Sequence, residues 1–199
     1  GLGDVYKRQE WRQFTYNLDV QNSPGSRGRG ILAGGYDPRA SANSESNIGF
    51  INIASAGNAQ NFGELATGRS CRATSSETRG LLACGFVSPT GSNIIEYVTM
   101  ASSGNGIDFG DSTHQRRNFA MVSSSTRAVL AGGESPANLN VMDYVQIGTL
   151  GNALDFGDLT ANRQGNTGMS SPVRGIYTGD QNDYNTTCLL YTSPSPRDL

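Results

Sequence analysis

The ten residues GNALDFGDLT, at positions 151–160, recur in altered form twice earlier in the chain. The earlier copies are GNGIDFGDST at 104–113 and GNAQNFGELA at 57–66, so the period is about 47 residues. A DFG triplet suggests a protein kinase, but the glycine-rich phosphate loop, paired lysine and HRD-type catalytic loop of a kinase are all missing. A segment that recurs at a fixed period is normally architectural. The three copies therefore predict a repeat fold.

Longer units align around these copies. They begin with RGILAGG at Arg29, RGLLACG at Arg79, RAVLAGG at Arg127 and RGIYTGD at Arg174. A set of basic and aromatic residues recurs in equivalent places, and we expect its members to have structural roles. The set is Arg79, Arg127, Arg174, Tyr97, Tyr144, Phe62, Phe109 and Phe156.

The two ends of the chain do not share the repeat. Residues 1–9 (GLGDVYKRQ) and 188–199 (CLLYTSPSPRDL) resemble a translated sequencing-library adapter read on opposite strands. Suitable codons for LGDVYKRQ give DNA whose reverse complement encodes CLLYTSPSPR, which unrelated termini should not do. We therefore interpret both ends as artefacts of metagenomic sequencing and exclude them from the fold. Two disordered tails are the alternative.

Composition narrows the classes of function. Hydrophobic residues make up 36% of the chain, and 26 glycines bring the total close to that of an ordinary globular protein. Charged residues are 16% and the net charge is -2, without a basic stripe, so we expect no nucleic-acid partner. No apolar run approaches the ~18 residues of a membrane span, so we expect no membrane insertion.

Each unit contains four short strand-like segments bounded by turn residues. In the second unit they lie near 68–76, at 79–85, at 94–101 and at 107–111. Before the last segment we expect a turn, SSGN at 102–105, in which Gly104 and Asn105 tolerate positive φ. The two glycines that close the second segment predict a close approach of two backbones.

The third segment of each unit is apolar on both faces. In the second unit Val98 and Met100 face one way and Tyr97 the other. The equivalent residues are Ile51, Ile53 and Phe50 in the first unit and Val145, Ile147 and Tyr144 in the third. Because strands that are apolar on both faces are covered on both faces, the units should form sheets that pack face to face.

The AGG closing the second segment, the tyrosine of the third and the aromatic of the fourth resemble kelch repeats over about residues 11–180. The resemblance implies an all-β, kelch-like β-propeller fragment of about three and a half four-stranded blades within residues 10–187. Kelch units usually carry tryptophan soon after the tyrosine, whereas here Phe109 and Phe156 follow Tyr97 and Tyr144 by twelve positions. Since propellers close with about 4–8 blades, such a fragment should leave blade faces exposed and should self-associate.

The motifs RGxLAGG, DYVxI and GNAxDFGDL are also similar to repeats in structural and tail proteins of tailed phages. This resemblance implies a non-enzymatic virion structural protein, located in the virion, with no cofactor. Its partners would be other virion proteins or a host-surface glycan or protein. Two alternatives stay open. One is a cellular kelch-type module for protein binding, and the other is a propeller-scaffold enzyme of the carbohydrate oxidase or glycosidase type.

The residues that could carry chemistry have simpler structural interpretations. His114 is the only histidine, which is too few for a copper site, and Cys71 and Cys84 lack metal spacing and are expected to be free thiols. Acids recur with the repeat, which favours structural roles in turns over a glycosidase acid and base. We expect the repeated arginines to meet these acids or to cap backbone carbonyls nearby. These acids are Glu64, Asp108, Asp111, Asp155 and Asp158.

The connection between the second and third segments varies most in length. From the second glycine to the aromatic of the third segment it spans 15 residues in the first unit, from Gly35 to Phe50. Variable loops on a rigid scaffold are common recognition sites. We therefore expect a carbohydrate- or protein-binding loop in the first unit, formed by Tyr36, Asp37, Arg39, Asn43 and Glu45.

Overall fold

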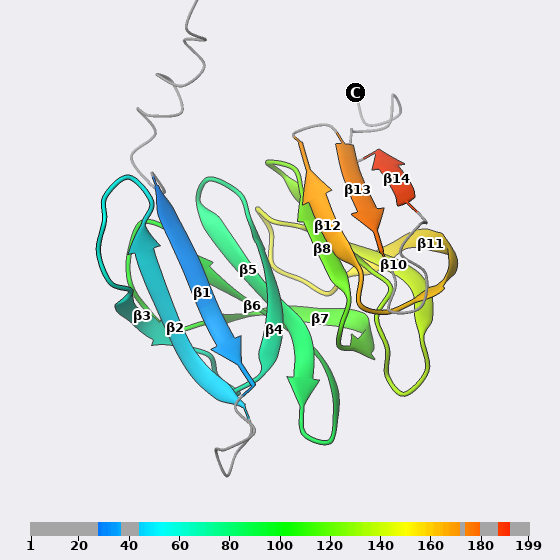
Figure 1. Ribbon diagram of the computed structural model, residues 1–199, viewed down its shortest axis with the longest axis horizontal. Coiled ribbons are helices and arrows are strands. Elements are labelled where there is room, and N and C mark those ends of the chain that lie inside the picture. The colour runs from blue at the N-terminus through cyan, green and yellow to red at the C-terminus, as the bar shows by residue number, and fades with distance from the viewer. Residues whose placement is uncertain (1–27, 37–43, 172–173, 180–186, 192–199) are drawn as a thin grey trace, which may run out of the picture.

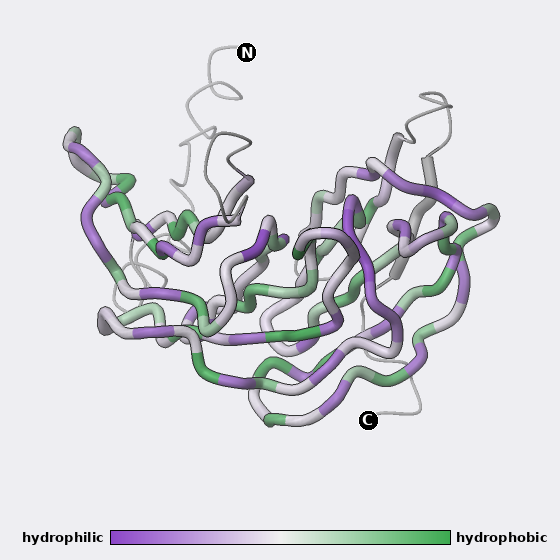
Figure 2. The backbone as a smooth tube through the Cα atoms, turned by 90° about the horizontal axis from the view of Figure 1, so that it is seen from below, coloured by the Kyte–Doolittle hydropathy of each residue, from purple (hydrophilic) through white to green (hydrophobic). Residues whose placement is uncertain are grey.

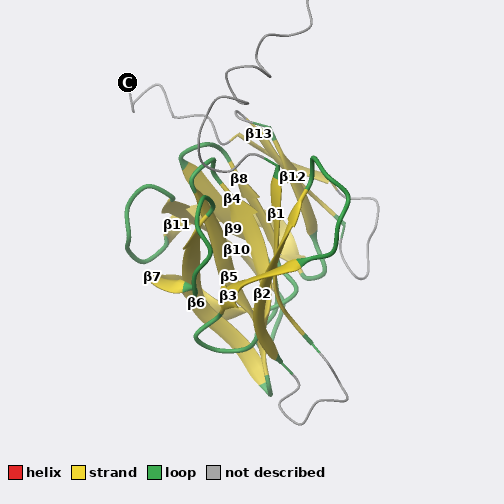
Figure 3. Ribbon diagram, turned by 90° about the vertical axis from the view of Figure 1, so that its left-hand side faces the viewer, coloured by secondary structure: helices red, strands yellow, loops and turns green. Residues whose placement is uncertain are grey.

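The computed structural model describes residues 28–36, 44–171, 174–179 and 187–191, the last five as backbone only. These residues form strands, turns and loops without a helix (Figure 3), which confirms the expected all-β class. No helix that is long and apolar enough to cross a membrane occurs in these ranges. Of the segments interpreted as adapter sequence, residues 1–9 and 192–199 lie outside these ranges, whereas 188–191 lie in a strand, Thr187–Tyr191, that pairs with Arg174–Thr178.

The strands form four antiparallel sheets that follow one another in chain order (Figure 1). Sheet 1 contains β1 (Arg29–Gly35), β2 (Glu45–Asn52) and β3 (Gln60–Glu64). Sheet 2 contains β4 (Ser70–Ser75), β5 (Arg79–Val87), β6 (Thr90–Thr99) and β7 (Ile107–Arg116). Sheet 3 contains β8 (Ala120–Ser123), β9 (Arg127–Ala131), β10 (Leu139–Gln146) and β11 (Leu154–Arg163). Sheet 4 contains β12 (Thr167–Ser170), β13 (Arg174–Thr178) and β14 (Thr187–Tyr191).

The four segments expected in the second unit are the four strands of sheet 2. Their order in the sheet is β4-β5-β6-β7, so each strand pairs with the next along the chain. The strand β7 continues to Arg116, five residues beyond the expected end at position 111. Strand β6 begins at Thr90, four residues before the expected start at 94, and its Ser92 pairs with Arg116 of β7. Strand β5 also runs two residues past its expected end, to Val87.

Apolar side chains fill the space between successive sheets. Hydrophobic and hydrophilic residues alternate along much of the chain (Figure 2). Val98 packs with Phe62 of sheet 1, whereas Tyr97, its neighbour on β6, packs into the cluster shared with sheet 3. In sheet 3, Val145 lies in the cluster shared with sheet 2, and Tyr144 packs against the cluster shared with sheet 4. The prediction that both faces of these two sheets are covered is therefore confirmed.

The first sheet departs from this expectation on one face. The residue three positions after the opening arginine is buried in the other three sheets. It is Leu82 in sheet 2, Leu130 in sheet 3 and Tyr177 in sheet 4, with exposures of 1%, 0% and 2%. Leu32 has the same place in sheet 1 and is 54% exposed, and the nearby Ile53 is 68% exposed. No sheet among the described residues covers that face, so Ile51 and Ile53 are exposed instead of covered, and sheet 1 presents an exposed face of the kind expected for a fragment.

The recurring decapeptide joins each sheet to the next. Gly151 N–H donates to the Phe109 carbonyl at 2.9 Å, and Ala153 N–H donates to the Asp111 carbonyl at 2.7 Å. The Asn152 side chain accepts the Asp111 N–H at 3.0 Å. The GN start of one copy thus lies against the FGD of the copy before it, which explains why both parts recur together.

The preceding pair of copies makes the same contacts. Gly104 N–H donates to the Phe62 carbonyl at 2.8 Å, and Asn105 Oδ1 accepts the Glu64 N–H at 3.1 Å. A Cβ on Gly63 would lie 2.2 Å from the Gly104 carbonyl oxygen. Gly104 and Asn105 do not adopt the positive φ that they could tolerate in a turn, and their place is set by this contact.

The glycine pair that closes the second strand of each unit permits close backbone approach, as expected. A Cβ on Gly34 would lie 2.0 Å from the Arg69 carbonyl oxygen, and one on Gly85 would lie 2.1 Å from that of Ser70. Cys84 stands at the place of Gly34 and adopts φ +48°, a left-handed conformation that L residues rarely adopt.

Candidate recognition surface

The connections between the second and third strands of sheets 2 and 3, at 88–89 and 132–138, lie together at the lower edge of Figure 1. Beside them runs a row of side chains contributed by three sheets, which we call the edge row. Its members are Tyr36, Phe86, Arg117 and Glu134.

The edge row is held together by ring and ion contacts. The rings of Tyr36 and Phe86 meet edge to face with centroids 5.7 Å apart. The Arg117 guanidinium lies over the Phe86 ring, 5.1 Å from its centroid. The Nε of Arg117 is 3.1 Å from Glu134 Oε1. Asn118 Nδ2 donates to the same oxygen at 3.0 Å. Aromatic, cationic and anionic groups therefore stand side by side with fixed spacing.

The members of the edge row are open to solvent to different degrees. Tyr36 is 54% exposed, and the side chains of Arg117 and Glu134 are 36% and 15% exposed. A partly exposed aromatic ring offers an apolar face, while the neighbouring guanidinium and carboxylate offer a donor and an acceptor. Such a set can contact a sugar ring with its hydroxyls, or a polar peptide.

The predicted recognition loop is only partly placed. Tyr36 belongs to the edge row, whereas Asp37, Arg39 and Asn43 lie outside the described residues. Glu45 begins β2 and pairs with Gly35, and its carbonyl accepts the Arg69 N–H at 3.1 Å. Sequence reasoning missed Phe86, Arg117 and Glu134, although Glu134 lies on a connection between the second and third strands, the kind expected to carry recognition.

The repeated arginines and aromatics form a stack in each of the first three sheets. The guanidinium groups of Arg29, Arg79 and Arg127 lie 5.0, 4.7 and 4.6 Å from the centroids of the aromatic rings of Phe50, Tyr97 and Tyr144. Each of these rings meets the next phenylalanine edge to face, at 6.0 Å for Phe62, 6.1 Å for Phe109 and 5.9 Å for Phe156. The structural repeat residues are thus brought together.

Two of these arginines also reach the following sheet. Arg79 Nη1 donates to the Ile147 carbonyl at 2.8 Å, and Arg29 Nη1 donates to the Met100 carbonyl at 3.0 Å. The two alternatives expected from the sequence were an acid of the FGD segment and a backbone carbonyl, and the carbonyl is the one observed for Arg79. Arg174 lies at the start of β13, where its N–H donates to Ser171 Oγ at 3.1 Å.

Buried ion pairs join the sheets more deeply. Arg116, at the end of β7, places Nη2 2.7 Å from Asp143 Oδ2 on β10, and both side chains are 0% exposed. Ser112 and Thr113 on β7 donate three further hydrogen bonds to this carboxylate. The carboxylate therefore fixes the end of one sheet onto the next.

The same arrangement occurs one repeat earlier. Arg69 Nη1 lies 2.5 Å from Glu96 Oε2, and the Ala66 N–H donates to Glu96 Oε1 at 2.9 Å. Sequence reasoning missed these pairs. The signal was present, because Arg69, Arg116 and Arg163 recur at the period of the repeat and an acid precedes Tyr97 and Tyr144.

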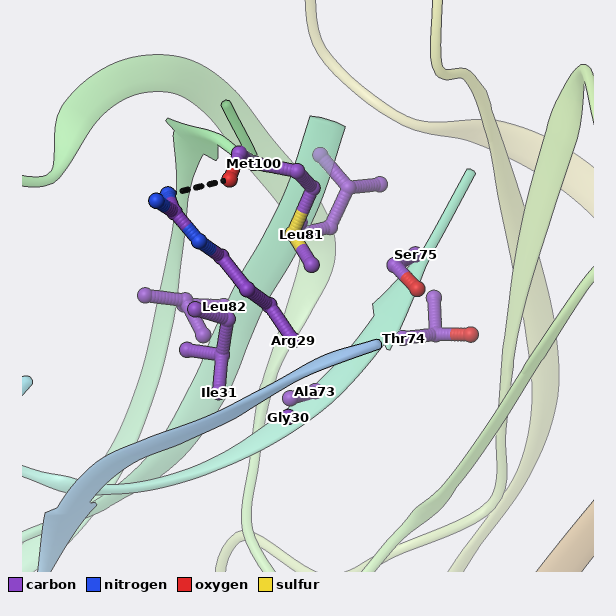
Figure 4. A pocket seen from close by; sticks show the side chains of 10 residues that line it. Arg29, Gly30, Ile31, Ala73, Thr74, Ser75, Leu81, Leu82 and Met100 are labelled. Carbon is purple, nitrogen blue, oxygen red and sulfur yellow. Dashed lines mark hydrogen bonds between the residues drawn. The ribbon is translucent and has the colours of Figure 1, made fainter. Parts of the chain in front are cut away.

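A cavity of about 220 Å³ lies between sheets 1 and 2 (Figure 4). Ile31, Ala73 and Leu81 line it, and the Arg29 side chain crosses it to reach the Met100 carbonyl. Its lining is largely apolar and brings no carboxylate or histidine into the cavity. The cavity is therefore a packing gap rather than an arrangement for acid-base chemistry.

The cysteines and the histidine have simple surroundings. Cys71 and Cys84 are free thiols, as expected. Burial raises the pKa of Cys84 to about 12 and also raises that of Cys71. His114 is exposed and its Nδ1 lies 2.8 Å from Thr113 Oγ1. Within the described ranges, no three His, Cys, Asp or Glu side chains gather as metal ligands would.

The chain matches no protein-family model, and no curated protein matches its sequence.

Proposed function

We propose that the chain is part of a kelch-like β-propeller that serves as a non-enzymatic scaffold in a phage virion or tail protein. The four sheets would be successive blades. The first strands of sheets 2, 3 and 4 support this, since Thr74 Oγ1 of β4 lies 2.7 Å from Ser123 Oγ of β8. Ser123 N–H in turn donates to Ser170 Oγ of β12 at 3.4 Å. First strands gathered in this way are expected along the centre of a propeller.

The exposed apolar face of sheet 1 supports the same proposal. Leu32 occupies a place that is buried in sheets 2, 3 and 4, so sheet 1 needs a further sheet beside it. Sheets that each require a neighbour on both faces are satisfied when they close into a ring.

The edge row carries the functional part of the proposal. It lies on the connections of stacked sheets, where rigid scaffolds present binding groups, and Tyr36 is more than half exposed. We propose that it binds a host-surface glycan or protein, with the Tyr36 ring against an apolar face and Arg117 and Glu134 on polar groups. The phage assignment is supported by the similarity of the repeat motifs to repeats in phage structural and tail proteins.

A binding measurement tests this proposal. The 199-residue chain is applied to immobilised bacterial surface polysaccharides and outer-membrane proteins, alongside Tyr36→Ser and Arg117→Gln. Each variant should bind about tenfold more weakly, as expected for loss of one ring or one charged contact. Glu77→Gln, on the exposed β4–β5 turn at the opposite edge, is the matched control. Equal binding by all four proteins would contradict the assignment of the edge row.

A further inference from the structure

The third arginine of the buried series lacks the carboxylate that the other two have. Arg163 ends β11 as Arg116 ends β7, and it is 92% buried, with 8% exposure. The structure gives Arg163 no ion pair with any described residue, and its Nε and Nη1 are buried without a hydrogen-bond partner. Nη1 of Arg116 differs, because it donates to the carbonyls of Gly132 and Val141 at 3.2 Å.

The strand register identifies where the missing carboxylate belongs. Glu96 on β6 pairs with Leu82, and Asp143 on β10 pairs with Leu130. In each case the paired residue lies three positions after the arginine that opens the unit. In sheet 4 that position is Tyr177, and its partner on β14 is Cys188.

A second alignment gives the same position. Glu96 follows Asn93 by three residues, and Asp143 follows Asn140 by three. The fourth unit has Asn185, and three residues later stands Cys188. Cys188 is also the first residue of the segment that we interpret as adapter sequence.

We propose that Arg163 forms a carboxylate-binding site, and that its ligand is an aspartate or glutamate at position 188 of the uninterrupted chain. Two observations carry this: a buried arginine whose Nε and Nη1 have no partner, and a register that places position 188 level with Glu96 and Asp143. The equivalent in sheet 1 is Gly49. Asn166 is a further buried polar residue without hydrogen bonds from its side chain. It is 4% exposed, and neither its Nδ2 nor its Oδ1 has a hydrogen-bond partner. In the chain as it stands, the fourth sheet is held to the third without this ion pair.

Substitution at position 188 tests the proposal. Cys188→Asp and Cys188→Asn are compared in the 199-residue chain by urea unfolding, because they share shape and differ in charge. Cys188→Asp should raise the folding equilibrium constant at least about tenfold over Cys188→Asn, the low end for a hydrogen bond to a charged group. In an Arg163→Gln background the advantage of the aspartate should vanish. An advantage that persists without Arg163, or an aspartate variant no more stable than the asparagine variant, would overturn the proposal.

Recovery of the uninterrupted reading frame gives a second test that does not depend on folding. The codon at position 188 should encode Asp or Glu. Any other residue in that place would overturn the proposal, whatever the unfolding experiments show.

Discussion

Replacing Asp143 with alanine should destabilise the protein more than any surface change. The Asp143 carboxylate is fully buried and accepts hydrogen bonds from Ser112, Thr113 and Arg116. Its removal leaves the Arg116 guanidinium buried with only the carbonyls of Gly132 and Val141 as partners. Breaking a buried ion pair in this way costs about 3–5 kcal/mol, a large part of the ~5–15 kcal/mol by which native proteins are stable.

Urea unfolding of the 199-residue chain, followed by circular dichroism, measures this cost. Asp155→Ala is the control, because Asp155 is exposed and accepts one hydrogen bond, from Gly157 N–H at 3.0 Å, so its effect should stay within about 0.5 kcal/mol. The double variant Arg116→Met/Asp143→Leu should recover most of the loss, since apolar replacement of a buried pair is often neutral. A loss below about 1 kcal/mol for Asp143→Ala would refute the assigned role.

Three further outcomes follow from the structure. Ala73→Met should stabilise the chain by about 1 kcal/mol in urea unfolding, because Ala73 lines the cavity between sheets 1 and 2 and its equivalent, Met121, is buried; destabilisation would show that the cavity cannot accept the side chain. Ile53→Glu should reduce self-association in light scattering, since Ile53 is 68% exposed beside Leu32; a monodisperse, heat-stable parent monomer would contradict this. Burial raises the pKa of the folded Cys84 thiol to about 12, so the unfolded chain loses this proton first and stability should fall with a slope set by one proton as the pH rises from the ordinary thiol pKa of ~8.5 towards 12. Cys84→Gly should remove that slope, and identical pH profiles of the two proteins would exclude it.

Much of the fold could be predicted because the same sequence pattern occurs in several units of the chain. The alternation of Tyr97 with Val98 and Met100 occurs three times, so the strand and both of its faces were evident. The glycine pair likewise indicated close backbone contact. The four strands of the second sheet were therefore predicted in the right order, but β5 runs on to Val87, β6 begins at Thr90 instead of 94, and β7 extends to Arg116.

The contacts between units were not predictable from a single unit. Asn152 and Asp111 belong to different copies, and their hydrogen bond depends on how the sheets stack. The Arg116–Asp143 pair is separated by 27 residues and looks like ordinary surface charge when one strand is considered alone. Burial, which decides its importance, is a property of the stacked sheets.

The edge row was only partly predictable for a similar reason. Tyr36 was identified from loop composition, but its contact with Phe86 joins connections of two different sheets. Arg117 lies on the link between sheets 2 and 3, and no local pattern relates it to Glu134. Such a surface becomes visible only when the ends of several sheets are placed side by side.

We propose that the sheets are blades that require a neighbour on each face and close into a ring. A crystal or cryo-electron microscopy structure of the protein encoded by the uninterrupted reading frame tests it most directly. The account predicts a closed ring of four-stranded sheets, with β4, β8 and β12 along a central channel and Leu32 buried by another sheet. An open, linear stack with Leu32 still in solvent would contradict it.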